Sequence, residues 1–173
     1  MGKKKNKFKV YKTESNTYTV YTDGSSLGNP GPGGVGVVIR LGDTQVELSD
    51  GYYLTTNNRM EILAACLALE NITGKRTVNL HTDSAYVING ITKWIWGWRK
   101  RGWTTGEGLP VKNKDLWMRL DNVRKKHNVR FIKVPAHSGV VLNELADTLA
   151  KNGSNNPTLI DDGYLAEINA NGN

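Results

Sequence analysis

Four acidic residues stand at positions that suit a solvated charge poorly: Asp23, Glu61, Asp83 and Asp147. Asp23 ends an alternating run of β-branched and aromatic residues, which is typical of a strand, and Asp83 ends a second short expected strand over 78–83. Glu61 has Ala65 and Ala68 four and seven residues later, where a surface Glu more often has a Lys or Arg partner. Asp147 lies beside the leucine face of an expected helix. These positions favour carboxylates that serve chemistry.

Carboxylates that crowd together away from water repel one another strongly, so such a cluster needs cations. Oxygen ligands without nearby Cys or His favour Mg²⁺ or Mn²⁺ over Zn²⁺. Two such ions about 3.5–4 Å apart can activate a water and stabilise the leaving oxygen in phosphodiester cleavage. A single strand-end Asp is more often a turn or helix cap, and spacing alone does not prove that the four acids meet.

His137 lies in a loop, residues 135–139, between the last expected strand and the last expected helix. A lone loop His is more often merely exposed. Its position ahead of Asp147, with Gly139 as a pivot, also suits a mobile proton carrier. Both interpretations stay open on these residues alone.

The elements that must position these side chains begin with three strands, over 18–23, 35–40 and 45–54. Their connections are too short for crossovers, which predicts an antiparallel meander. A helix follows, with Thr56 or Asn57 as its cap, and ends at Gly74 before a strand over 78–83. This strand–helix–strand step implies a parallel neighbour and a right-handed crossover.

The rest of the chain predicts further helices and one more strand. A short helix starts at Ser84 and stops at Gly90, two more follow around 91–98 and 116–123, and 129–134 is the last strand. The final helix should turn one face toward the core, made of Leu142, Leu145, Ala146 and Leu149. The predicted fold class is α/β, a five-stranded mixed sheet with its first three strands antiparallel, flanked by helices.

The 173 residues suffice for one domain with a sizeable core. We expect a flexible basic arm over 1–12, a folded domain over 13–156 and a loosely ordered tail over 157–173. The net charge of +7 favours polyanions, meaning nucleic acid or an anionic membrane surface, although plain solubility is the simpler explanation.

No apolar run approaches the roughly 20 residues that cross a bilayer, and the basic start of the chain lacks the apolar region of a secretory signal. A lone Cys66 excludes a disulfide framework and fits a reducing cytoplasm. We therefore expect a cytoplasmic monomer that has no membrane partner.

Taken together, these motifs resemble type 1 ribonuclease H in its bacterial form. The matching stretches are Thr22-Asp23-Gly24-Ser25 with Gly28-Asn29-Pro30-Gly31, Thr56-Asn57-Asn58-Arg59-Met60-Glu61, Thr82-Asp83-Ser84, and His137 followed by Asp147. The resemblance runs from about Tyr18 to about Asn156 and implies the ribonuclease H-like fold. It also implies endonucleolytic hydrolysis of the RNA strand of an RNA–DNA hybrid.

By this resemblance the four acids, Asp23, Glu61, Asp83 and Asp147, bind two Mg²⁺ ions, with Mn²⁺ as the alternative metal. His137 matches the family's catalytic histidine, which takes or relays a proton, and Glu144 matches another acid near the histidine loop. Val140-Val141-Leu142 is more apolar than the corresponding loop of many relatives, which bears on the mobility of His137.

The resemblance further implies a substrate surface. The RNA minor groove would contact Gly24, Ser26, Asn29, Asn57 and Asn58, whose amide and main-chain groups can both donate to and accept from a 2′-hydroxyl. The DNA strand would lie over Trp94, Trp98, Lys100, Arg101 and Trp103, with a phosphate at Thr56 and Asn113. From helical spacing alone, Trp94 and Trp98 fit a core face equally well.

One departure from the family pattern is Ala85, which stands where some members have a Gln that reaches the minor groove. Two other hypotheses compete with a hybrid-cleaving enzyme. The asparagines expected to contact RNA 2′-hydroxyls argue against a junction resolvase of the same fold. The complete set of four acids argues against a module that binds hybrids without cutting them.

Overall fold

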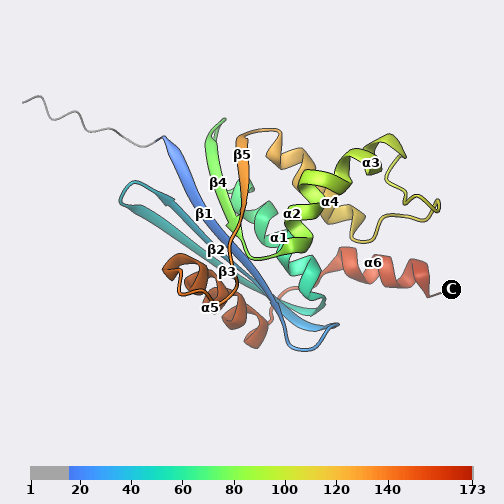
Figure 1. Ribbon diagram of the computed structural model, residues 1–173. Helices are drawn as coiled ribbons and strands as arrows, with labels where there is room; N and C mark the ends of the chain where they lie inside the picture. Colours follow the sequence, from blue (N-terminus) through green and yellow to red (C-terminus); the bar gives the residue numbers. More distant parts are fainter. Residues whose placement is uncertain (1–15, 173) are drawn as a thin grey trace, which may run out of the picture.

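In the computed structural model, which describes residues 16–172, one five-stranded sheet runs through the molecule in the order β3-β2-β1-β4-β5 (Figure 1). The strands are β1 (Thr17–Ser26), β2 (Gly31–Leu41), β3 (Thr44–Thr55), β4 (Thr77–Thr82) and β5 (Asn128–Lys133). The first three are antiparallel, whereas β4 pairs parallel with β1 and β5 parallel with β4. The predicted mixed sheet is confirmed. The arm expected over 1–12 lies outside the described residues.

Helices cover both faces of this sheet. They are α1 (Asn57–Glu70), α2 (Ala85–Asn89), the π-helical turn η1 (Gly90–Trp94), α3 (Ile95–Lys100), α4 (Lys114–Arg124), α5 (Val141–Asn155) and α6 (Asp162–Asn171). Successive strand residues face opposite sides of a sheet, and Gly33 faces Met60 of α1 while Gly34 faces α5. Helix α5 therefore lies on one side, and α1 with α4 on the other (Figure 1). Within residues 16–172 no helix has both the length and the apolar character that a bilayer crossing requires.

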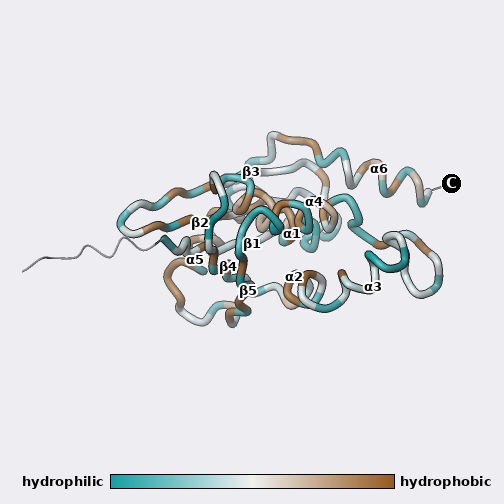
Figure 2. Tube along the Cα trace, turned by 90° about the horizontal axis from the view of Figure 1, so that it is seen from above, coloured by the Kyte–Doolittle hydropathy of each residue, from teal (hydrophilic) through white to brown (hydrophobic). Residues whose placement is uncertain are grey.

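The main core lies on the α1 side of the sheet. Val20, Val35 and Leu80 from three neighbouring strands pack there with α1, and α4 covers the outer side of that helix. Because α1 lies between the sheet and α4, it is buried around nearly its whole circumference rather than along one stripe. Figure 2 shows the hydrophobic stretches of the trace gathered where the sheet, α1 and α4 overlap.

Helix α5 contacts the opposite face through small residues. A Cβ added at Gly36 would clash with the carbonyl oxygen of Ala146, and one at Gly34 with that of Ala150, so the helix main chain rests directly on the sheet. The predicted core face of α5 is therefore confirmed for Ala146, which is fully buried, and wrong for the leucines, because Leu142, Leu145 and Leu149 are only half-buried. The close approach needs residues without bulk, and the leucines flank the contact.

The prediction that a short helix stops at Gly90 is also wrong. Gly90 has helical φ and ψ, and the helix continues from α2 through η1 into α3. A Cβ at Gly90 would collide with the indole ring of Trp117 from α4. The glycine is needed because it admits this ring, not because it ends the helix.

The tail expected to be loosely ordered over 157–173 instead carries α6 in its described part. Asp161 caps this helix by accepting a hydrogen bond from Tyr164 N, and it also forms an ion pair with Arg59 at 2.8 Å. Arg59 is fully buried in α1 and makes a second ion pair, with Asp115 of α4, at 2.7 Å. A buried guanidinium requires such partners, and this requirement fixes the tail against two helices.

Replacement of Gly36 by Ala should lower the free energy of unfolding by about 2–3 kcal/mol, because the added methyl group forces α5 away from the sheet. Chemical denaturation measures this change. Gly106→Ala is the matched control, since no atom lies within 4 Å of a Cβ built at that loop position. Equal stability of the two variants would contradict the direct seating of α5 on β2.

Candidate metal centre

The site begins where the sheet opens. The parallel pairing of β1 with β4 ends at Thr22 and Thr82, whereas β1 continues to pair with β2 as far as Ser26. Asp23 and Asp83 are the first residues beyond the last β1–β4 pair, so both stand at the fork between the diverging strands. Such a fork, outside the carboxyl ends of parallel strands, is where α/β sheets collect functional side chains.

Glu61 reaches the same fork from α1. A Cβ at Gly24 would collide with the main chain of Met60 and Glu61, so this glycine lets the helix approach β1 at the point where the acid is needed. Asp23, Glu61 and Asp83 each place one carboxylate oxygen within 4.8 Å of the others. Glu61 Oε2 is buried and has no hydrogen-bond partner among residues 16–172. A divalent cation fits this donor set, because the oxygen-only ligands and the unpaired buried oxygen both call for positive charge.

Asp147 of α5 completes the group from the other face of the sheet. It interacts directly with Asp23, while its Oδ2 forms an ion pair with Lys151 at 2.9 Å. Asp147 is thus more exposed than Asp23 and Glu61, and one of its oxygens already faces a cation. The structure brings all four predicted acids together, three of them in the tight cluster and the fourth at its edge.

The electrostatics of the cluster follow from burial and mutual repulsion. Burial, with a further contribution from the charge of Asp83, raises the pKa of Asp23 to about 7. Burial, reinforced by Asp23, raises the pKa of Glu61 well above its ordinary value. Burial also raises the pKa of Asp83, although Lys133 opposes the shift. Without a cation, this trio therefore holds protons at a pH where ordinary carboxyls have none.

Two lysines near these acids escaped the sequence analysis. Burial acts to raise the pKa of Asp147, but the hydrogen bond from Lys151 outweighs it and lowers that pKa overall. Lys133 ends β5 beside Thr82, the residue before Asp83. The helical spacing of Asp147 and Lys151, four residues apart, is the signal that could have found the first pair. Lys133 required knowledge of the strand register.

His137 lies in the exposed loop that joins β5 to α5. It adopts a left-handed main-chain conformation, with φ of 51°, and Gly139 follows with φ of 79°. Burial is the largest influence on the pKa of Asp83 and of Asp147, and the charge of His137 is among the smaller influences that lower both. The loop therefore presents a titratable group to the edge of the cluster.

The predicted RNA-contacting residues lie around the same fork. Asn57 N, at the start of α1, donates to Asn29 Oδ1 at 3.1 Å, which ties the β1–β2 turn to the helix that carries Glu61. Thr56 caps this helix and accepts from Arg59 N at 3.2 Å. The set gathered here is Gly24, Ser26, Asn29, Asn57 and Asn58.

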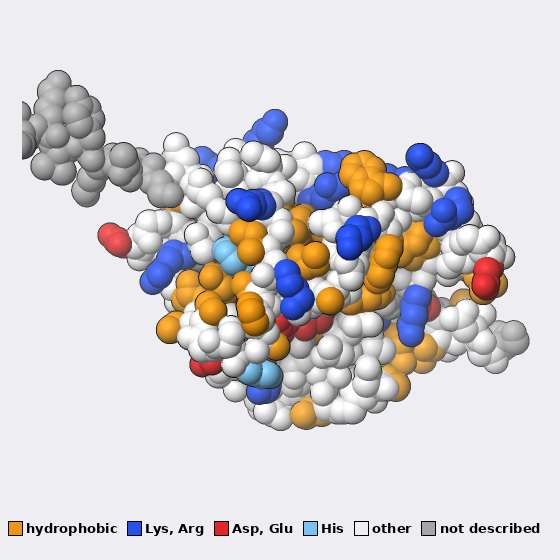
Figure 3. All heavy atoms as spheres, in the orientation of Figure 1, with side chains coloured by type: hydrophobic (Ala, Val, Ile, Leu, Met, Phe, Trp, Pro, Cys, Tyr) orange, Lys and Arg blue, Asp and Glu red, His pale blue; other side chains and the backbone are white. Residues whose placement is uncertain are grey.

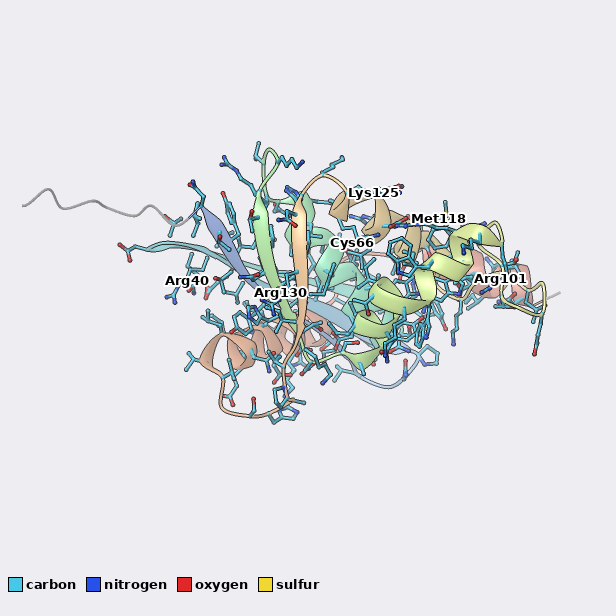
Figure 4. All side chains as sticks on the ribbon, turned by 45° about the horizontal axis from the view of Figure 1, so that its top comes forward. Arg40, Cys66, Arg101, Met118, Lys125 and Arg130 are labelled. Atoms are coloured by element: carbon cyan, nitrogen blue, oxygen red, sulfur yellow. The ribbon has the colours of Figure 1, made fainter. Side chains whose placement is uncertain are left out.

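The predicted DNA-contacting residues form a separate aromatic and basic protrusion. Trp98 packs on the fully buried Trp117 with ring centroids 5.4 Å apart, and on Trp94 at 6.0 Å and Trp103 at 6.2 Å. Trp94 is 41% exposed, so the tryptophans run from the core to the surface, and a purely core position does not describe Trp94. Figure 4 places Arg101 at the outer end of α3, and Figure 3 shows Lys and Arg side chains over this part of the molecule.

Asn113, at the start of α4, is 1% exposed and has a left-handed main chain with φ of 60°. Its Nδ2 donates to the hydroxyl of Tyr86 at 3.0 Å, so its side chain points into the protein interior and not toward solvent. Its main-chain N–H donates to Glu167 Oε2 of α6 at 2.8 Å. This contact of Glu167 was not predicted from the sequence, because the segment 157–173 was expected to be loosely ordered.

The chain resembles known proteins in both sequence and structure. The RNase H family model matches residues 15–155. Ribonuclease HI of Pasteurella multocida (strain Pm70) is 51% identical over 148 residues, which cover 86% of this chain and 96% of that protein. All four acids lie within the matched segment.

Solved structures agree with this result. The crystal structure of LC9-RNase H1, a type 1 RNase H with the type 2 active-site motif, superposes with a TM-score of 0.74 at 30% identity and covers 88% of this chain and 80% of that one. The foamy viral protease-reverse transcriptase, solved in complex with RNA/DNA hybrid, superposes with a TM-score of 0.69 at 26% identity. That match covers 79% of this chain and 20% of the viral one.

Without divalent metal, the free energy of unfolding should fall as pH rises from about 4 to about 7. Asp23 titrates near 3.8 when unfolded and at about 7 when folded, so the folded state binds more protons across this window. Asp23→Asn should flatten the slope and stabilise the metal-free protein at pH 8 by about 2–4 kcal/mol.

Urea denaturation in a chelator, at several pH values, measures this dependence. Asp43→Asn removes a carboxylate at an exposed turn and should leave the slope unchanged. Added Mg²⁺ should stabilise the wild type more than Asp23→Asn. Parallel slopes for all three proteins would contradict the electrostatic account of the cluster.

Proposed function

This chain belongs to the RNase H family, and we propose that its carboxylate cluster is the site at which it cleaves RNA. Its family makes it a divalent-metal-dependent endoribonuclease that hydrolyses the RNA strand of RNA–DNA hybrids. The observation that carries the site assignment is the meeting of three carboxylate oxygens within 4.8 Å of one another, together with the buried and unpaired Glu61 Oε2. No solvated surface cluster would leave such an oxygen unpaired.

Asp23, Glu61, Asp83 and Asp147 are proposed to hold two Mg²⁺ ions, with Mn²⁺ as the alternative. Hard oxygen donors and the absence of Cys or His among the four support this choice. When bound, the ions would activate a water and stabilise the leaving oxygen of the phosphodiester. The four acids would fix the positions of the ions, because β1, β4, α1 and α5 hold these acids from both faces of the sheet.

His137 is proposed to carry a proton at a ring nitrogen between solvent and the leaving oxygen. Its exposed loop lets the imidazole reach water, and its electrostatic influence on Asp83 and Asp147 supports a place beside the reacting phosphate. Glu144 lies in the first turn of α5, next in the chain after this loop, and we assign it a supporting part in product release.

RNA recognition is assigned to the end of β1, the β1–β2 turn and the start of α1. Because Asn29 Oδ1 accepts from Asn57 N, the Nδ2 group of Asn29 is the half of that amide available to a ribose oxygen. Gly24, Ser26, Asn57 and Asn58 add main-chain and side-chain groups that can both donate to and accept from a 2′-hydroxyl. DNA lacks that hydroxyl, so these contacts discriminate the RNA strand.

The DNA strand is assigned to the protrusion, where Trp94, Trp98 and Trp103 offer flat apolar surface beside Lys100 and Arg101. Such interleaving suits stacking on sugars and contact with phosphates. Thr56 and the main-chain amide of Asn113 are assigned to one DNA phosphate. Because all these groups come from one chain, we propose that the enzyme acts as a monomer, and the buried free Cys66 supports a reducing cytoplasm (Figure 4).

Asp23→Asn and Asp83→Asn should each lower the cleavage rate by roughly 100-fold or more while hybrid binding persists, because one missing charge weakens the metal site. The assay incubates an RNA–DNA hybrid, an RNA duplex and a DNA duplex with and without Mg²⁺. Only the hybrid should be cut, and only with metal. Wild-type cutting by Asp83→Asn would refute the ligand assignment.

Lys100→Ala and Arg101→Ala should each reduce the slope of log Kd against log salt by about one unit, because each removes one phosphate contact. Binding is measured on uncut hybrid in the Asp23→Asn background. Lys75→Ala, in the turn before β4, is the charge-matched control and should leave the slope unchanged. A common slope in all variants would remove the protrusion from the binding surface.

A further inference from the structure

The contact between Glu167 and Asn113 joins an acid of the C-terminal helix to a group assigned to the substrate. Glu167 Oε2 accepts from Asn113 N at 2.8 Å, at the N-terminal end of the eleven-residue helix α4. Main-chain amides at such a helix end bind phosphate oxygens in the same way that they bind a carboxylate. A negatively charged oxygen of the protein therefore already occupies the place where a negatively charged oxygen of the substrate would bind.

The surroundings of Glu167 belong to the substrate surface as well. A cavity of about 320 Å³ is lined on one side by Asn29, Thr56 and Asn58, and on the other by Tyr164, Glu167 and Ile168 of α6. The first wall carries the RNA-contacting asparagines and the phosphate-binding threonine of the proposed function. Helix α6 thus forms the opposite wall of a cavity that residues of the proposed substrate surface line, and Glu167 of that wall contacts Asn113 N.

The two ends of α6 differ in how firmly they are held. The N-terminal end is fixed by Asp161, which accepts hydrogen bonds from Arg59, Thr55 and Tyr164 N. Beyond Tyr164, the helix buries no further side chain, and in Figures 1 and 2 it extends away from the sheet toward the C-terminus. Glu167 lies in this weakly packed half, so it can leave Asn113 while the Asp161 anchor stays in place.

We propose that the Glu167 carboxylate is an intramolecular stand-in for a phosphate of the DNA strand, and that the substrate must displace it from Asn113 to bind fully. The inference rests on the proposed function for the identity of the competing anion. Since only the fraction of molecules with Glu167 displaced offers the amide, the observed Kd exceeds the intrinsic Kd by the inverse of that fraction. Glu167 then sets the affinity of the enzyme for its substrate.

Tyr86 connects this contact with the cleavage site. Its hydroxyl accepts from Asn113 Nδ2 at 3.0 Å and from Trp117 Nε1 at 3.3 Å, and Tyr86 stands three residues after Asp83. The Asn113 side chain is therefore fixed whether or not Glu167 is present. Removal of Glu167 should expose the main-chain amide without moving the residue that carries it.

The first test uses inorganic phosphate and the amide resonance of Asn113 in ¹⁵N-labelled protein. With Glu167→Ala, phosphate should shift this resonance at a concentration at least about fivefold below that needed for the wild type. Asp162→Ala removes an exposed acid from the same helix and should behave as the wild type. Glu167→Gln keeps the bulk of the side chain and should also show the shift of the Asn113 resonance at a lower phosphate concentration than the wild type. It serves as a second variant in case Glu167→Ala folds poorly.

The second test measures Kd for uncut RNA–DNA hybrid in the Asp23→Asn background. Glu167→Ala should tighten binding by about three- to tenfold, and Asp162→Ala should not. The proposal is overturned if Glu167→Ala leaves either titration unchanged, or if Asp162→Ala tightens binding equally, since that would be a general charge effect. Neither measurement requires cleavage, so a failure of the proposed catalytic activity would appear in the cleavage assay and not here.

Discussion

The repulsion among carboxylates at the fork between β1 and β4 is the constraint on which the rest of the structure depends. Asp23, Glu61 and Asp83 place oxygens within 4.8 Å of one another in surroundings that raise the pKa of each. A flexible scaffold would relieve this repulsion by letting the acids move apart. The chain instead holds them from β1, the end of β4 and α1, so that a divalent cation or bound protons are the remaining ways to relieve the repulsion.

Glycine is the means by which these elements come close enough. Gly24 admits the main chain of α1 beside Asp23, and Gly36, the partner of Asp23 across the β1–β2 pair, admits α5 on the opposite face. The acids of both helices are thereby aimed at one point of the sheet from its two sides. Rigid packing, with main chain against main chain, is what converts four separated positions in the sequence into one cluster.

The sheet and the four acids could be predicted from the sequence because each depends on short-range patterns. Alternating β-branched and aromatic residues mark β1, alternating apolar and polar residues mark β4, and the acids just beyond the β1–β4 pairing are Asp23 and Asp83. The half-buried position of the α5 leucines, the continuation through Gly90 and the helix α6 could not be predicted in this way. Each depends on a distant partner: the glycines of β2, the Trp117 ring and the Arg59 guanidinium. Glu167 was missed with α6, since its contact with Asn113 spans 54 positions.

The ion pairs of Arg59 also bear on how the chain reaches this state. Arg59 and Asp161 are 102 positions apart, and their contact is buried. During synthesis Arg59 therefore leaves the ribosome well before its partner Asp161 does. Until then a guanidinium on the helix that carries Glu61 has only Asp115 to neutralise it. Asp161, in the C-terminal segment, is thus the later of the two acidic partners of Arg59 to be synthesised.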